Sequence, residues 1–370
     1  MKRKGLLYFS VVFLCLLASC YNKQNSNNNY QFTAKPIVKT IGNIDVMVDP
    51  NVEMMMVIGR LAKIPPYSFD YPEPISYLNN VDEYFNDYRN DLVISEARRN
   101  KLTYYRLPEF GMYLKNDISG FTMKLNNKNF ITSDNIPAKN LFYRDKEFIK
   151  AVRDFRIKSN FDTFFIQNNV LYEKMIERNV AYLKELKFDI WLKDFYGKED
   201  NENLCLYLTY LTGGGNFGIS FRTPDGKIIP RAVIMDQGNK LGFIFLLAHE
   251  FSHPKTLSIT EELYKNEAVK SIFDKLYLAN IDVYNNNGYG CGKTVLNETI
   301  NQACANKFLE EVLPESGMEY FNEKEIKERQ KMIYVPQIAE FLDNYENNRK
   351  KYKTLENFVP ELEKFVLTLE

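Results

Sequence analysis

The spacing of hydrophobic residues predicts a chain that is mostly helical with a small sheet. Apolar residues recur at helical spacing through much of both halves. Alternating or β-branched runs mark the strand candidates, which are residues 36–48, 204–211, 216–222 and 228–235. A Pro-Asp-Gly sequence between the last two runs is typical of a hairpin turn. We therefore predict an α+β fold with a small antiparallel or mixed sheet packed on a helix.

The first nineteen residues are predicted to be a signal peptide. Three basic residues, Lys2-Arg3-Lys4, precede an apolar run over 5–18 that is too short to span a bilayer. The run ends in Leu-Ala-Ser-Cys20, which resembles a bacterial lipobox. That resemblance implies cleavage before Cys20 and lipid modification of its thiol and amine. We thus expect a protein anchored by lipid to the periplasmic or outer surface of a bacterial membrane.

The rest of the chain divides into three segments. Residues 20–35 are polar and rich in Asn, which predicts a flexible tether after the lipid-modified cysteine. Residues 36–203 are predicted to form a mostly helical N-terminal part. Residues 204–370 are predicted to form a second part with the remaining strands, a central apolar helix and C-terminal helices.

Charge and cysteine content exclude some functions. The chain has 48 basic and 48 acidic residues with no basic block, so nucleic acid is not expected as a partner. Cys205, Cys291 and Cys304 are widely spaced, which fits neither a disulfide framework nor a zinc finger. The pattern leaves open whether any pair of them forms a disulfide, and it leaves the oligomeric state open.

The only two histidines of the chain lie four residues apart, in His249-Glu250-Phe251-Ser252-His253. On a helix these positions share one face, so both imidazoles can bind one metal ion, and zinc suits them. Glu250 stands where the general base of a zinc hydrolase is found. The run over 240–253 is predicted to be a buried helix that Pro254 ends. A capping box at 258–261 is predicted to open the next helix.

Zinc needs a third protein ligand, and no histidine remains for it. Asp, Glu and Cys are the possible residue types. Glu261 and Glu262 are the nearest carboxylates downstream, but they are predicted to lie in the first turn of a helix, where acidic residues complement the helix dipole. Glu298 lies within a predicted helix among apolar residues, so its burial would call for a cation.

The segment that begins Asn297-Glu298 resembles the Asn-Glu-x-x-x-Asp segment of thermolysin-like gluzincins. The resemblance implies that Glu298 is the third zinc ligand beside His249 and His253. The chain departs from the gluzincin pattern at Gln302, where those enzymes carry an Asp that orients a zinc-binding histidine. Gln can still accept a hydrogen bond from a ring N–H, but it brings no charge.

Residues 36–313 also resemble an uncharacterised zincin-like domain family of Bacteroidetes-type lipoproteins. The features that carry this resemblance lie at 161–165, 191–197, 216–218, 249–253 and 298. The resemblance implies a metallopeptidase of unknown substrate. In zincins, a strand in the position of 216–222 pairs with the substrate backbone. Here that segment is equally compatible with an ordinary sheet strand.

Taken together, the sequence predicts a zinc-dependent hydrolase with a peptide or protein substrate. Glu250 is the expected general base, and Tyr289, in a Gly-rich loop, is expected to stabilise the oxyanion. One alternative is a lipoprotein binding module whose zinc site is structural or inactive. Another is a metal hydrolase that acts on a non-peptide amide. An open coordination position for water would favour an enzyme over a structural site.

Overall fold

The fold is taken from a computed structural model, which describes residues 32–70, 75–100, 102, 105–114, 140, 145–197, 203–223 and 228–369. The predicted signal peptide, Cys20 and most of the predicted tether lie outside these residues. Within them the chain is α+β, mostly helical with a small mixed sheet, as the hydrophobic pattern predicts.

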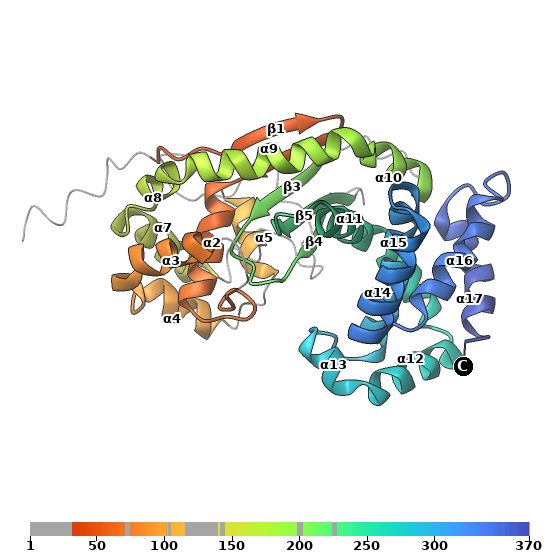
Figure 1. The fold of residues 1–370 in the computed structure, drawn as a ribbon. Helices are drawn as coiled ribbons and strands as arrows, with labels where there is room; N and C mark the ends of the chain where they lie inside the picture. Colours follow the sequence, from red (N-terminus) through yellow and green to blue (C-terminus); the bar gives the residue numbers. More distant parts are fainter. Residues whose placement is uncertain are drawn as a thin grey trace, which may run out of the picture.

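The N-terminal part contributes two strands and a set of helices (Figure 1). Its elements are β1 (Ile37–Ile41), β2 (Ile44–Val48), α2 (Pro50–Leu61), α3 (Ile75–Tyr84), the 3-10 helix η2 (Asn86–Tyr88), α4 (Leu92–Arg99), α5 (Arg106–Tyr113), α7 (Lys146–Lys158), α8 (Phe161–Gln167), α9 (Asn169–Leu186) and α10 (Phe188–Tyr196). The strand predicted over 36–48 is in fact a hairpin, because Gly42 adopts a φ of +54° and turns the chain back.

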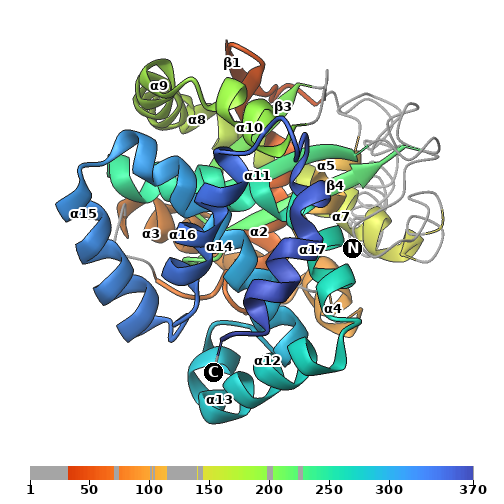
Figure 2. The same ribbon diagram turned by 90° about the vertical axis from the view of Figure 1, so that its right-hand side faces the viewer.

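The second part supplies three strands and the remaining helices. Its elements are β3 (Leu204–Thr209), β4 (Phe217–Arg222), β5 (Ile228–Met235), α11 (Lys240–Leu263), α12 (Glu267–Ala279), α13 (Ile281–Asn286), α14 (Gly292–Val312), α15 (Glu315–Tyr320), the π-helix η4 (Phe321–Arg329), α16 (Val335–Glu346) and α17 (Leu355–Val366). Helices α12, α15 and α16 pack against α14 on one side of the molecule, and α17 packs on α11 and α16 (Figures 1 and 2).

The five strands form one sheet in the order β1-β2-β3-β5-β4. The central pairs β2–β3 and β3–β5 are parallel, and the outer pairs β1–β2 and β4–β5 are antiparallel. The sheet therefore joins strands from both predicted parts of the chain. Strand β4, from the segment that resembles the substrate-binding strand of zincins, lies at one edge of the sheet formed by the described residues.

Helices cover the two ends of this sheet. Helix α9 packs along β1, β2 and β3, whereas α11 packs on β5 and β4 (Figure 1). On its other side α11 packs against α14, and this helix pair is the most extensive helix contact in the described chain. The arrangement buries α11 between the edge of the sheet and the C-terminal helices.

The predicted end of the helix that carries the two histidines is wrong. Helix α11 continues through Pro254 to Leu263, and the predicted capping box at 258–261 lies inside it. Pro254 removes the hydrogen bond to the Glu250 carbonyl, but that carbonyl lies against Gly218 of β4. The Thr256 hydroxyl donates to the Ser252 carbonyl, 3.3 Å away, and supports the same turn. Packing on both sides therefore holds the helix through its proline.

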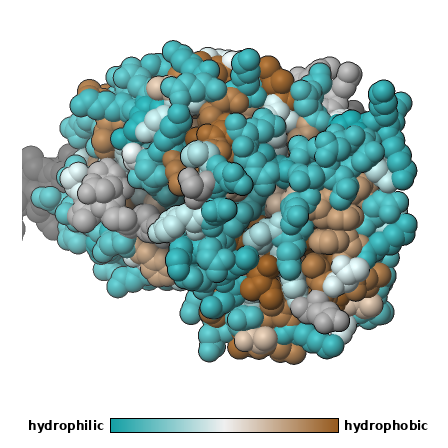
Figure 3. Space-filling view, turned by 45° about the vertical axis from the view of Figure 1, so that its right-hand side comes forward, coloured by the Kyte–Doolittle hydropathy of each residue, from teal (hydrophilic) through white to brown (hydrophobic). Residues whose placement is uncertain are grey.

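On the face shown in Figure 3, most of the surface is hydrophilic and apolar residues gather in separate patches. Apolar side chains that are more than half exposed include Val170, Leu278 and Tyr320, which lie on different helices. Scattered exposed apolar residues are normal for a folded protein. Among the described helices, none has the length and apolar character needed to cross a membrane.

Away from α11, several carboxylates are enclosed in the core, among them Glu53, Glu109 and Asp162. Glu53 of α2 accepts hydrogen bonds from the Tyr77 hydroxyl at 2.6 Å and the Thr209 hydroxyl at 2.8 Å, and Tyr77 also bonds the Tyr172 hydroxyl. Burial raises the pKa of Glu53 to about 7, although both hydrogen bonds oppose the shift. Between about pH 4.5 and 7, Glu53 is therefore protonated in the folded chain and ionised in the unfolded chain.

The substitution Glu53→Gln is expected to change how stability depends on pH. The raised pKa means that wild-type unfolding free energy falls as pH rises through this window, by about 3 kcal/mol for this group. Gln carries no charge and removes that loss. The stability of the variant relative to the wild type should therefore be higher at pH 8 than at pH 5. Denaturant unfolding at both pH values measures this. The control is Glu261→Gln at an exposed position, whose effect on stability should be the same at both pH values. An equal effect of Glu53→Gln at both pH values would contradict the raised pKa of Glu53.

Candidate metal centre

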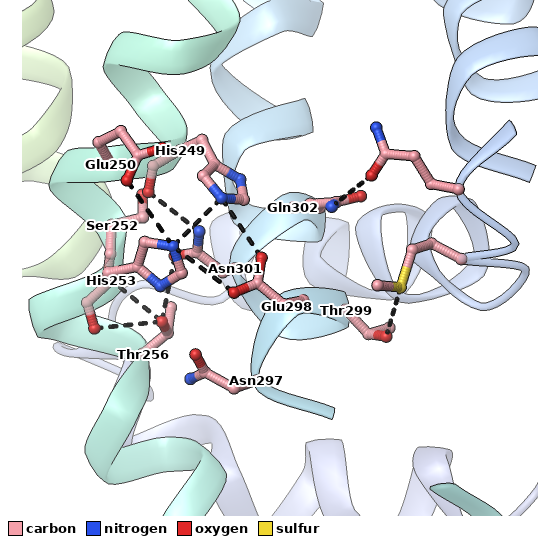
Figure 4. Close-up of polar contacts among 12 residues, drawn as sticks. His249, Glu250, Ser252, His253, Thr256, Asn297, Glu298, Thr299, Asn301 and Gln302 are labelled. Carbon is pink, nitrogen blue, oxygen red and sulfur yellow. Dashed lines mark hydrogen bonds and ion pairs between the residues drawn. The ribbon is translucent and has the colours of Figure 1, made fainter. Parts of the chain in front are cut away.

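The centre is built first by α11. The Asn239 side chain caps its first turn by accepting from the Gly242 N–H at 2.7 Å. The apolar run that follows is mostly buried and fixes which face of the helix meets the sheet. His249 and His253 then lie one turn apart, and their Nε2 atoms are 3.1 Å from each other (Figure 4).

Helix α14 brings the third group. Asn301 donates from Nδ2 to the His249 carbonyl at 3.0 Å and accepts from the Thr256 hydroxyl at 3.2 Å. One turn earlier, Asn297 donates to the Thr260 hydroxyl at 3.0 Å. These bonds between side chains and the facing helix set the register of α14 against α11, and Glu298 lies between the two asparagines in the sequence.

The Glu298 carboxylate faces both imidazoles. Its Oε2 is 3.4 Å from the His249 Nε2, and its Oε1 is 3.8 Å from the His253 Nε2. A tetrahedral zinc ion about 2.0–2.1 Å from its ligands would place neighbouring ligand atoms roughly 3.3 Å apart. The three distances among these ligand atoms, 3.1, 3.4 and 3.8 Å, bracket that spacing. The side chains of His249 and Glu298 are about nine-tenths buried, while that of His253 is 21% exposed, so the centre is more open on the His253 side.

Glu250 lies beside the same cluster. Its Oε2 is 3.9 Å from the His253 Nε2, and its carboxylate accepts a hydrogen bond from the Gly218 backbone N–H of β4. His249, Glu250 and His253 together form a group that could hold a metal ion. Burial raises the pKa of Glu250 to about 7, with Glu298 adding to the rise and His249 opposing it.

The other three groups influence each other's charge. Burial lowers the pKa of His253 to about 4. Burial would also lower the pKa of His249, but its hydrogen bond to Glu298 and the two nearby carboxylates raise it above the ordinary value. Burial would raise the pKa of Glu298, yet His253, His249 and a Tyr289 hydrogen bond lower it. The site therefore pairs an ionised carboxylate with the two rings.

Two neighbours orient these side chains. The Asn297 side chain hydrogen-bonds His253, and the Tyr289 hydroxyl hydrogen-bonds Glu298. Such outer contacts fix the direction in which a metal ligand points. The structure thus brings Tyr289 to the centre, in contact with Glu298, and its expected role at an oxyanion stays a prediction.

Gln302 does not make the hydrogen bond considered for it. Its Nε2 donates to the Gln330 Oε1 at 2.8 Å, and its Oε1 is buried with no hydrogen-bond partner in the part of the chain that the structure describes. The Nδ1 of His249 is likewise buried, and no described residue hydrogen-bonds it. The structure therefore shows Gln302 linked to Gln330, and it does not show the histidine contact that the gluzincin resemblance implies.

The alternative carboxylates lie elsewhere. Glu261 and Glu262 are exposed and belong to the last turns of α11, whereas the sequence predicted them in the first turn of a separate helix. Sequence reasoning also missed Asn301 as a contact to α11. Its spacing of four from Asn297 was a usable signal, because it places both on one face of α14.

A model of one protein family, described as "Domain of unknown function (DUF4932)", matches residues 44–365. The chain belongs to the DUF4932 family. The matched range holds strands β2 to β5, α11, and all the residues that the structure brings together at the centre. No curated protein and no solved structure gives a significant match. The DUF4932 match therefore establishes membership of a family and leaves the chemistry to be argued from the site.

The close approach of β4 to α11 is expected to make Gly218 sensitive to substitution. A Cβ at this position would lie 2.3 Å from the Glu250 carbonyl oxygen and 3.0 Å from the His253 Cβ. Gly218→Ala should therefore lower the free energy of unfolding by about 2 kcal/mol, as overpacking does. Thermal or denaturant unfolding measures it, with Gly290→Ala as control because an added Cβ there meets no atom within 4 Å. Equal stability of the two variants would refute the contact.

Proposed function

We propose that this DUF4932 protein is a zinc-dependent peptidase of the gluzincin type. The observation that carries the proposal is the convergence of His249, His253 and Glu298 from two helices, with Glu250 beside them. The donor set fits zinc, because two imidazole nitrogens and one carboxylate are a usual set for a catalytic zinc ion, and three protein ligands leave a position for water. Their mutual distances also match a tetrahedral ion.

Zinc bound by these three residues would acidify a water molecule and polarise a substrate carbonyl. The chain's own groups supply the rest. Glu250 is placed to accept a proton from water and to pass it to the leaving amine. The Gly218 N–H holds the Glu250 carboxylate in place, and Asn297 and Tyr289 hold His253 and Glu298.

The edge position of β4 supports a peptide as substrate. An extended chain can add to a sheet edge by backbone hydrogen bonding. At Gly218 this edge strand contacts Glu250, so a peptide along β4 would pass the general base. We propose that the peptide or protein substrate binds in this way.

We also propose that the protein works in the cell envelope, anchored to a bacterial membrane through lipid on Cys20. The support comes from the sequence of residues 1–20, where a basic start, a short apolar run and the lipobox-like end occur in order. Mass spectrometry of the membrane fraction tests this, because lipid on Cys20 adds a defined mass that Cys20→Ala abolishes.

Zinc binding is expected to depend on Glu298 and not on the nearer acidic residues. The soluble chain lacking residues 1–29 should bind one zinc ion, and Glu298→Ala should weaken that binding strongly, because the carboxylate contacts both rings. Glu261→Ala and Glu262→Ala are matched controls, since both residues are exposed on the same helix as the histidines. Metal titration gives the affinities. Wild-type affinity in Glu298→Ala would eliminate the gluzincin assignment.

Peptide hydrolysis is expected to depend on Glu250 while zinc binding does not. Glu250→Gln keeps the size of the side chain and removes its basicity, so the rate should fall by at least about 100-fold with zinc content unchanged. Hydrolysis of a mixed peptide library, followed by mass spectrometry, provides the measurement. Full turnover in the variant would remove Glu250 as base. A zinc-loaded wild type that cleaves no peptide would point to the binding module or to a non-peptide amide.

A further inference from the structure

The described chain enters the fold at a fixed point beside α8. The Asp162 Oδ2 accepts hydrogen bonds from the backbone N–H of Thr33 at 2.5 Å and of Ala34 at 3.1 Å. Arg156 bonds the other oxygen of Asp162 at 2.5 Å, and its guanidinium carbon lies 4.4 Å from the centre of the Phe32 ring. Residues 32–34 are therefore held against the first turn of α8 by a buried ion pair.

This point of entry limits how far the fold can lie from a lipid anchor. Phe32 follows Cys20 by twelve residues. A fully extended chain gains at most about 3.6 Å per residue, so Phe32 lies no more than about 43 Å from a lipid-modified Cys20. The anchor would therefore keep the start of α8, and the elements next to it, near the bilayer surface.

Exposed apolar side chains lie close to this point. Ile166, near the end of α8, is 45% exposed, and Val170, in the first turn of α9, is 63% exposed. From Val170 onward, exposed residues follow at intervals of four and three, so they share one face of the helix. We call this surface the α9 face, and its residues are Ile166, Val170, Lys174, Glu177, Ala181 and Lys184.

A groove between α9 and β1 widens the α9 face. Its volume is about 450 Å³, and it is lined by Lys39, Thr40, Ile41, Glu177, Val180, Ala181 and Lys184. The Lys39 Nζ is 3.0 Å from the Glu177 Oε1, so these two charges form an ion pair. Lysines therefore stand on both walls of the groove. With Glu173, which is exposed beside Lys174, the face and its groove carry three lysines and two glutamates.

The α9 face and the proposed metal centre lie at different ends of the sheet. Helix α9 packs on β1, β2 and β3, whereas α11, which carries the two histidines, packs on β5 and β4. Figures 1 and 2 show α9 and β1 along one side of the molecule and α12 and α13 on the opposite side. A membrane against α9 would therefore leave the centre on the part of the molecule that faces water.

We propose that the α9 face rests on an anionic lipid bilayer and orients the anchored protein with its metal centre towards water. The inference rests on the lipid anchor of the proposed function and names the surface that meets the membrane. An anchor keeps the bilayer at a high effective concentration, so a face with weak affinity of its own suffices to orient the fold. Ile166 and Val170 gain free energy at the acyl-chain boundary, and anionic headgroups attract the lysines.

The test uses the mature chain from Cys20 on, coupled through that thiol to a maleimide-bearing phospholipid. The vesicles contain phosphatidylcholine and phosphatidylglycerol. Cys291→Ser removes an exposed thiol, and Cys205 and Cys304 are buried. A tryptophan is then added by Val170→Trp on α9 or by Leu278→Trp on α12, where the native side chains are 63% and 65% exposed. Lipids brominated on their acyl chains quench a tryptophan that contacts them.

Bromination is expected to lower the added emission of Val170→Trp at least about twofold, since interfacial side chains reach about 5–10 Å towards the acyl chains. The added emission is measured against the chain that carries only Trp191. The emission of Leu278→Trp should not change. Equal quenching at the two positions, or no quenching of Val170→Trp, would overturn the proposal. So would a dimer in solution that Val170→Glu dissociates, because the face would then belong to a second copy of the chain.

A charge variant tests the part of the groove. Lys39→Glu combined with Lys184→Glu reverses the charge of both walls, so it should restore most of the quenched emission of Val170→Trp. Lys265→Glu combined with Lys275→Glu is the matched control, since both lysines are exposed on the side of α12. Unchanged quenching in the groove variant would overturn the role of the lysines. Failure of the proposed anchor is distinguishable, because it shows as missing lipid on Cys20 in the cell, whereas here the chain is attached chemically.

Discussion

The carboxylate of Glu298, buried against two imidazole rings, is the interaction on which the rest of the centre depends. A carboxylate taken out of water is costly unless cations or hydrogen-bond donors surround it. Here His249, His253 and Tyr289 surround it, and a metal ion would complete the compensation. The carboxylate can occupy this position only if α14 is held in one register against α11. Asn297 and Asn301 supply that register through side-chain bonds to the facing helix.

The edge of the sheet is coupled to the same helix by a backbone contact. Pro254 leaves the Glu250 carbonyl without its helical partner, and Gly218 is the residue that lies against it. The absence of a side chain at Gly218 lets β4 approach α11 closely enough for its N–H to bond the Glu250 carboxylate. A proline in a helix and a glycine in a strand are each unfavourable on local grounds. Together they place a sheet edge beside Glu250, the proposed general base.

The third support comes from a rare element. A nine-residue π-helix is longer than the single-turn π-bulges usually found, and such irregularities concentrate near functional sites. In this chain its two ends contact Phe245 and Gln302, so the segment braces α11 and α14 from one side. The sequence predicted only C-terminal helices in this part of the chain, with nothing to distinguish a π-helix among them. The structure instead has the π-helix, a turn and then α16, because Gln330 and Met332 bond carbonyls five and six residues back.

The sequence by itself determined what depends on neighbouring residues. The spacing of four between His249 and His253 places their rings on one face of any helix that contains them, and the periodicity of apolar residues predicted the α+β composition. It could not determine where α11 ends, because the local preference of Pro254 is overridden by packing from β4 and α14. The hydrogen-bond partner of Gln302 could not be determined from the sequence either, since it depends on where the fold places Gln330. That Glu298, 45 residues after His253, meets the histidine pair was decided by the tertiary structure alone, because only the packing of α14 on α11 brings residues so distant in sequence within bonding distance.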